Sequence, residues 1–151
     1  MTPDEWQVFR AVRLAALLDA PYAFGSTYER EVVADEDNWR KRLVGRAQFV
    51  AELDGMVVGT AGGIASDAAS AALVSMWVSP QARGKGAGDG LVNAVLDWAR
   101  GEGFGAVYLW VTVGNLAAER LYARGGFTRT GATQPVFPGE SRKELEMILN
   151  L

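Results

Sequence analysis

The residues with the clearest chemical signal in this chain form a basic, glycine-rich segment that leaves an apolar run and enters an amphipathic one. Glycine has no Cβ, so several backbone N–H groups can converge on an anion without steric hindrance. The helix expected to follow adds its unpaired N–H groups and the positive end of its dipole. The pattern predicts a site for a pyrophosphate. We expect it to be formed by Arg83, Gly84, Lys85, Gly86, Ala87 and Gly88.

The spacing of these residues excludes two common nucleotide-binding loops. A P-loop needs Ser or Thr directly after its lysine, and Lys85 is followed by glycine. The dinucleotide motif Gly-x-Gly-x-x-Gly also fails, because Asp89 stands where its last glycine is required. What remains is Gln-x-x-Gly-x-Gly, formed by Gln81, Gly84 and Gly86. This motif resembles the coenzyme A signature of the GNAT family of N-acetyltransferases.

A second segment resembles the same family further along the chain. Asn115 follows an apolar run and is a favourable residue for the start of a helix. Tyr122 lies close to two helical turns further on, and therefore on the same side of that helix. The resemblance implies that Asn115 hydrogen-bonds the cofactor arm and that Tyr122 is the catalytic acid. A phenol of pKa about 10 is protonated at neutral pH and suits a thiolate of pKa about 8.5.

The resemblance also implies the reaction: acetyl-CoA as co-substrate and a primary amine of a small molecule or protein as acceptor. Backbone groups of Met76 and Val78 would pair with the pantetheine arm like an added strand, and a main-chain N–H near Val78 would stabilise the thioester oxygen. The chain contains neither Cys nor His, which excludes an acetyl-cysteine intermediate, an imidazole base and the usual Cys or His metal ligands. We therefore expect direct transfer in a ternary complex, without a metal.

The residues that act on the acceptor are harder to predict. Many relatives carry a carboxylate early in the strand before the glycine loop, where this chain has alanines at 71 and 72. Glu29, Glu31 and Glu52 are candidate bases acting through water, although a solvated surface charge is the simpler interpretation of each. The missing carboxylate keeps two alternatives open: a non-catalytic acyl-CoA-binding or regulatory module, and a protein N-terminal acetyltransferase.

Aromatic residues are further candidates for the acceptor pocket. Trp77 and Trp110 could line this pocket, but core packing is their expected role. Family members shape their acceptor sites with residues at positions that correspond to Tyr22, Phe24, Phe137 and the loop 134–138.

Length and composition predict one domain over 1–151, because 151 residues suffice for a single core. The net charge of −3 argues against nucleic acid as the main partner. No apolar run reaches the roughly 18 residues of a membrane span, and charged residues interrupt any signal-peptide pattern near the start. We expect a cytoplasmic protein without a membrane partner. Homodimers are common in such folds, but no feature of the sequence decides this.

The periodicity of apolar residues and the turn signals predict an α/β chain. The resemblance implies a twisted mixed sheet flanked by helices, in which two strands splay apart around the cofactor arm. Relatives usually begin with a strand before the first helix, and its absence here predicts an open sheet edge. Helices are expected at 2–19, 36–45, 88–100 and after Asn115, and strands at 48–53, 56–64, 72–78, 106–113, 127–133 and 144–149, with 72–78 and 106–113 as the splayed pair.

Overall fold

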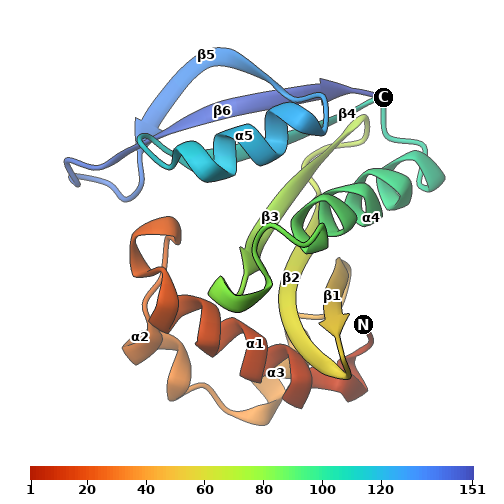
Figure 1. Cartoon of the computed structure of the whole chain (residues 1–151), viewed down its shortest axis with the longest axis vertical. Coiled ribbons are helices and arrows are strands. Elements are labelled where there is room, and N and C mark those ends of the chain that lie inside the picture. Colours follow the sequence, from red (N-terminus) through yellow and green to blue (C-terminus); the bar gives the residue numbers. More distant parts are fainter.

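Six strands form one mixed sheet in the computed structural model, which describes residues 1–151 (Figure 1). The strands are β1 (Ala47–Leu53), β2 (Met56–Ala65), β3 (Ser70–Val78), β4 (Ala106–Thr112), β5 (Thr128–Pro135) and β6 (Lys143–Asn150). Their order is β1-β2-β3-β4-β6-β5, and only β3 and β4 are parallel neighbours. The predicted mixed sheet is therefore confirmed.

Helices cover both faces of the sheet, and each face has its own apolar core. On one face, α4 and α5 pack on the central strands around Val95, Val107 and Leu109. On the other face, α1 and α3 pack around Phe9, Trp39 and the indole of Trp77. The helices are α1 (Trp6–Asp19), α2 (Tyr28–Val32), α3 (Glu36–Lys41), α4 (Ala87–Gly101) and α5 (Leu116–Arg124), with short 3-10 turns at Pro3–Glu5, Pro21–Ala23 and Pro80–Ala82.

Most predicted elements are present, with three differences near the start of the chain. The helix expected over 2–19 begins as a 3-10 turn, and the helix expected over 36–45 ends at Lys41. The short helix α2 was not predicted, because five residues cannot show a helical repeat; the Thr27 side chain begins it by accepting from the N–H of Arg30. No strand precedes α1, so β1 is the sheet edge, as expected.

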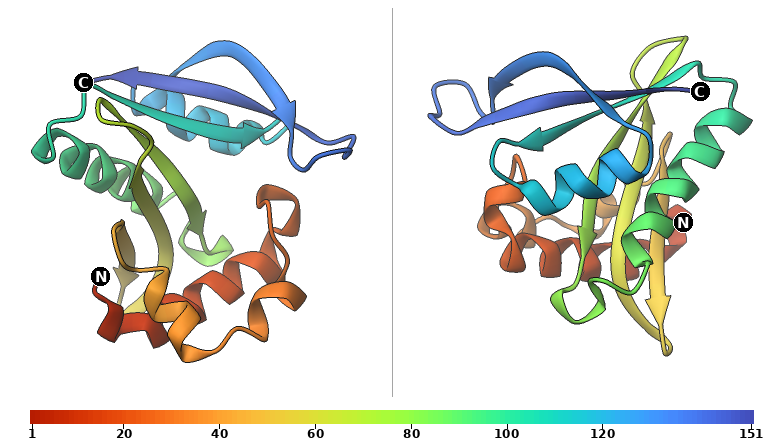
Figure 2. Two further views of the ribbon diagram at one scale, coloured as in Figure 1. Left: turned by 180° about the vertical axis from the view of Figure 1, so that it is seen from behind. Right: turned by 45° about the horizontal axis from the view of Figure 1, so that its top comes forward.

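The strands β3 and β4 diverge after a short common stretch, as the resemblance implied. They pair only from Ser70 to Ala72 on β3 and from Ala106 to Tyr108 on β4. Beyond these residues the two strands separate, and Figure 2 shows them running in different directions. The backbone groups that face β4 along the rest of β3 therefore have no strand partner. No helix in the chain is both long enough and apolar enough to cross a membrane.

Candidate functional site

A cavity of about 720 Å³ lies where β3 and β4 diverge, bounded by both strands, the glycine loop and α5. It brings together most of the residues predicted to bind the cofactor, although they are distributed over three separate elements. Lys85 and Ala87 instead line a neighbouring groove against β1. The predicted residues that line the cavity itself are Met76, Val78, Arg83, Gly84, Gly86, Gly88, Asn115 and Tyr122.

The glycine loop requires glycine for its backbone conformation rather than for space. Gly84 and Gly86 have φ angles of 74° and 86°, in the left-handed region, yet a Cβ on either would meet no atom within 4 Å. Gly86 is the N-cap of α4, so the first N–H groups of that helix lie beside the loop. Gly88 differs, because its Cβ would come within 3.2 Å of the Leu121 side chain. It allows α4 and α5 to approach closely.

The two cations of the loop have different surroundings. The Arg83 guanidinium donates to Asp19 at 2.8 Å and to the Val78 carbonyl at 3.1 Å, and its backbone N–H donates to Pro80. Asp19 also accepts from the Trp77 indole at 2.9 Å, so it connects the end of α1 to β3 and the loop. Trp77 is thus a buried core residue, as expected. Lys85 is exposed and belongs to no ion pair.

A bulge in β3 redirects the backbone beside the cavity. The pairing of β2 with β3 shifts between Thr60 and Gly62, and Ser75 has a φ of 56°, which is uncommon for a residue with a side chain. The shift changes which backbone groups of the following residues, including Met76 and Val78, point toward the gap. Sequence reasoning missed Ser75, since no glycine or asparagine marks the bulge.

Asn115 and Tyr122 lie on α5, at the side of the cavity formed by that helix. The Asn115 side-chain oxygen caps the helix by accepting from the N–H of Ala118 at 3.3 Å, which leaves the amide N–H₂ free of protein partners. The Tyr122 ring packs edge-on against Phe127 and is only 6% exposed. Burial raises the pKa of Tyr122 well above its usual value, so its phenol keeps its proton at neutral pH.

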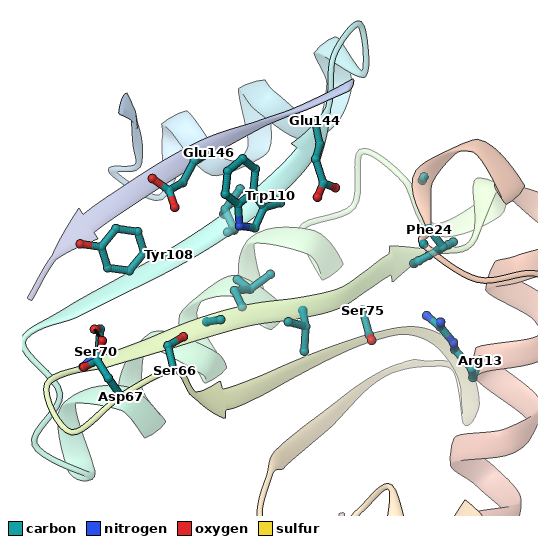
Figure 3. Close-up of a pocket in the computed structure, with 16 residues that line it drawn as sticks. Arg13, Phe24, Ser66, Asp67, Ser70, Ser75, Tyr108, Trp110, Glu144 and Glu146 are labelled. Carbon is teal, nitrogen blue, oxygen red and sulfur yellow. Dashed lines mark hydrogen bonds between the residues drawn. The ribbon is translucent and has the colours of Figure 1, made fainter. Parts of the chain in front are cut away.

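A second cavity, of about 470 Å³, lies on the other side of the same gap (Figure 3). The two cavities adjoin, because they share the lining residues Ala23, Phe24, Leu73, Val74, Ser75 and Trp110. Glu144 and Glu146 project into the second cavity from β6. Sequence reasoning missed both, although their alternation with two buried residues was a usable signal that they share one face.

The other acceptor-side candidates fall in several places. Phe24 lines both cavities and Tyr22 lines the first, whereas Phe137 and the loop 134–138 line neither. The carbonyl of Tyr22 accepts from Thr112 at 3.2 Å and from Arg142 at 3.0 Å, which holds the loop after α1 against β4. Trp110 was expected in the core but is 36% exposed and lines both cavities.

The carboxylates proposed as bases from the sequence lie elsewhere. Glu31 is buried and accepts from Arg13 at 2.8 and 3.0 Å and from Arg42 at 2.9 Å, so its interpretation as a solvated surface charge was wrong. Burial alone would raise the pKa of Glu31, but the hydrogen bonds and charges of both arginines outweigh it and lower the pKa to about 2. Glu29 and Glu52 are exposed and line neither cavity.

Comparison with known proteins identifies the family that has this fold. Residues 11–127 match the model of the acetyltransferase (GNAT) family. The chain therefore belongs to the GNAT family.

Three relatives illustrate this similarity. N-acetylaspartate synthetase of Danio rerio is 34% identical over 118 residues, which cover 77% of this chain but 42% of that protein. The structure of yncA from Salmonella typhimurium, solved with its cofactor acetyl-CoA, superposes with a TM-score of 0.78 at 26% identity and covers 100% of this chain and 91% of that one. Ribosomal-protein-alanine N-acetyltransferase from Brucella melitensis gives a TM-score of 0.75 at 25% identity, covering 100% and 97% of the two chains. The chain thus spans less than half of the curated relative but nearly all of both solved structures.

Proposed function

We propose that this protein is an acetyl-CoA-dependent N-acetyltransferase that transfers the acetyl group directly to a primary amine in a ternary complex. The observation that carries the proposal is the cavity between β3 and β4, which has the glycine loop at one end and the Tyr122 phenol in its wall. The adjoining cavity lets an acceptor reach the gap from the other side. Direct transfer follows from the absence of cysteine, because no thiol is present to hold the acetyl group in between.

The residues present fit the chemistry of acetyl-CoA. Backbone N–H groups from Gly84 to Gly88 would bind the pyrophosphate, since the loop conformation and the start of α4 leave them without helical partners. Lys85 would add an exposed positive charge, whereas Arg83 would support the loop through Asp19. The free Asn115 amide, the backbone of Met76 and the backbone N–H of Val78, whose carbonyl already accepts from Arg83, would bind the pantetheine arm.

Tyr122 is proposed as the acid that protonates the departing thiolate. When bound, acetyl-CoA supplies a thioester whose cleavage releases a thiolate, and this thiolate needs a proton. Tyr122 lines the cavity, and its hydroxyl has no hydrogen-bond partner elsewhere in the chain. Its raised pKa ensures that the proton is present at neutral pH.

The substitution Tyr122→Phe tests this assignment. We expect turnover, measured as thiol release, to fall by about 10²-fold or more, the usual contribution of a positioned acid. The Kd for acetyl-CoA, measured by calorimetry, should change little, because the ring and its packing remain. Tyr28→Phe is the matched control, since Tyr28 packs against the opposite core and should leave turnover unaltered. Undiminished turnover in Tyr122→Phe would remove Tyr122 as the acid.

The same assay distinguishes the alternatives. A non-catalytic binding module would bind acetyl-CoA yet release no thiol with any amine in a broad panel that includes peptides. A protein N-terminal acetyltransferase, the activity named for the Brucella relative, would prefer peptide amines over small ones. We further propose that residues 1–151 act as one domain and in the cytoplasm, where acetyl-CoA is supplied.

A further inference from the structure

We infer that the acceptor is a small molecule with at least two ammonium groups, and that Glu144 and Glu146 bind the one that is not acetylated. The inference rests on the proposed function, because the second cavity is an acceptor site only if the first binds acetyl-CoA. Its location follows from the shared walls of the two cavities. The charge of its lining then determines which acceptors fit.

The second cavity presents carboxylates that have no cationic partner. Glu144 accepts one hydrogen bond from Gln134 at 2.7 Å, and Glu146 accepts one from Thr130 at 2.9 Å. Both donors are neutral, and neither glutamate belongs to an ion pair. Both side chains are only partly exposed, so their negative charges are less screened than those of a free surface residue.

A third carboxylate stands at the other end of the cavity. Asp67 accepts from the Ser70 hydroxyl at 2.6 Å and from the backbone N–H groups of Ala69 and Ser70. The hydrogen bond from the Ser70 side chain, followed by that from the Ala69 backbone, lowers the pKa of Asp67 and keeps it ionised. Three carboxylates therefore line the cavity, one beside the turn between β2 and β3 and two on β6.

The one cation in the lining, Arg13, is already paired with a carboxylate. Arg13 is 9% exposed in its side chain and holds Glu31 through two hydrogen bonds, while its guanidinium lies 4.9 Å from the Phe24 ring centroid. An acceptor carboxylate would have to compete with Glu31 for Arg13 and would share the cavity with three carboxylates. An anionic acceptor such as aspartate, the substrate that the name of the Danio relative implies for that protein, is thus disfavoured here.

Aromatic rings complete a site for an organic cation. Trp110 stands directly opposite Glu146 in the β4–β6 register, and Tyr108 is on the same face two residues earlier. Side chains directly opposite each other on neighbouring strands are in contact range. An ammonium group beside Glu146 would therefore also lie against an indole, an arrangement that favours cations over neutral groups.

The test uses three amines of matched length that differ only in the charge of the remote end. These are hexamethylenediamine, hexylamine and aminohexanoate, assayed by thiol release from acetyl-CoA. We expect kcat/KM to be highest for the diamine and lowest for aminohexanoate, with about tenfold or more between the diamine and hexylamine. Equal rates, or a preference for hexylamine or aminohexanoate, would overturn the inference and leave the proposed function intact. A basic peptide that outcompetes the diamine would overturn the small-molecule assignment.

Variants connect the preference to the two glutamates. Glu144→Gln and Glu146→Gln keep the shape of each side chain, and each should reduce the ratio of diamine to hexylamine kcat/KM several-fold. Glu102→Gln, a substitution on the surface beyond α4, is the matched control and should leave the ratio unchanged. An unchanged ratio in both cavity variants, with circular dichroism showing a native fold, would refute their role.

A binding measurement separates this inference from the proposed function. If no amine releases thiol, the proposed function fails and the acceptor role fails with it, and calorimetric titration with hexamethylenediamine alone then tests whether the two glutamates bind a diamine. Binding that weakens in Glu144→Gln and Glu146→Gln would sustain a site for diamines. Absence of binding would overturn it.

Discussion

The first cavity, proposed to bind acetyl-CoA and called the donor cavity, and the second, proposed to bind the amine and called the acceptor cavity, are lined by different kinds of residue. The donor cavity is bounded by a glycine loop whose backbone conformation matters more than its side chains. The acceptor cavity is lined mainly by side chains from β4, β6, the loop after α1 and the turn between β2 and β3, and it shares the β3 bulge at Ser75 with the donor cavity. We therefore predict that donor binding depends mainly on the conformation of the glycine loop, whereas acceptor choice depends on the charge of the lining side chains.

The largest expected effect lies behind the acceptor cavity, in Glu31→Gln. This change leaves Arg13 and Arg42 without their shared buried carboxylate, and breaking such a pair costs about 3–5 kcal/mol. Urea unfolding should show the loss. Glu36→Gln, which removes an exposed ion pair with Arg40, is the control and should cost well under about 1 kcal/mol. A loss that small in Glu31→Gln would mean that the buried pair does not hold α2 against α1.

Acid should weaken the same region. The pKa of Glu31 is lowered from 4.5 to about 2 in the folded protein, so its contribution is fully present above about pH 4.5 and is lost as the pH falls toward 2. The shift corresponds to about 3 kcal/mol. Unfolding free energy measured between pH 6 and 2 should therefore fall more steeply in the native protein than in Glu31→Gln. Parallel curves would contradict the assignment.

Conformation on the donor side is tested by Gly86→Ala. A residue with a Cβ at a φ of 86° costs about 1–2 kcal/mol, so acetyl-CoA affinity should fall about tenfold as the loop shifts away from this conformation. Gly90→Ala is the matched control, because Gly90 lies within α4 and a Cβ there meets no atom within 4 Å. Calorimetry on both variants decides the point. Equal affinities would show that the loop conformation is unimportant.

The smallest expected effect concerns charge on the donor side. Lys85→Met should weaken acetyl-CoA binding about threefold and reduce its salt dependence, since an exposed charge contributes modestly. Lys41→Met, at the end of α3, should change neither quantity. If Lys85→Met cost more than the loop change Gly86→Ala, charge rather than conformation would dominate donor binding.

Most of the residues predicted to bind the cofactor line one cavity, and the sequence could group them because they lie in short segments. Gly84 and Gly86 lie in one short motif, and Asn115 and Tyr122 lie on one helix, so spacing alone places each pair. The acceptor cavity is different, because Trp110 and Glu146 lie side by side only where β4 pairs with β6. These two strands are neighbours in the sheet although β5 lies between them in the sequence. Periodicity reveals which face a residue occupies but not which strand lies beside it.

Two side-chain contacts also escaped prediction for a physical reason. Arg83 is predicted to neutralise the pyrophosphate, but its ion pair with Asp19 from the end of α1 was not predicted. Glu31 was interpreted as a surface charge, because its partners come from α1 and from the turn after α3. In both cases the partner is distant in sequence, so charge patterning along the chain gave no signal.

The most direct test of the account is a titration of the isotope-labelled protein with acetyl-CoA, followed by NMR of its assigned amides. The account predicts that the backbone amides from Gly84 to Gly88 and the Asn115 side-chain amide shift together with one Kd. The amides of Glu144 and Glu146 should remain nearly unchanged until an acceptor is added. Shifts confined to β6, or a glycine loop that does not respond at saturating acetyl-CoA, would contradict the assignment of the donor cavity.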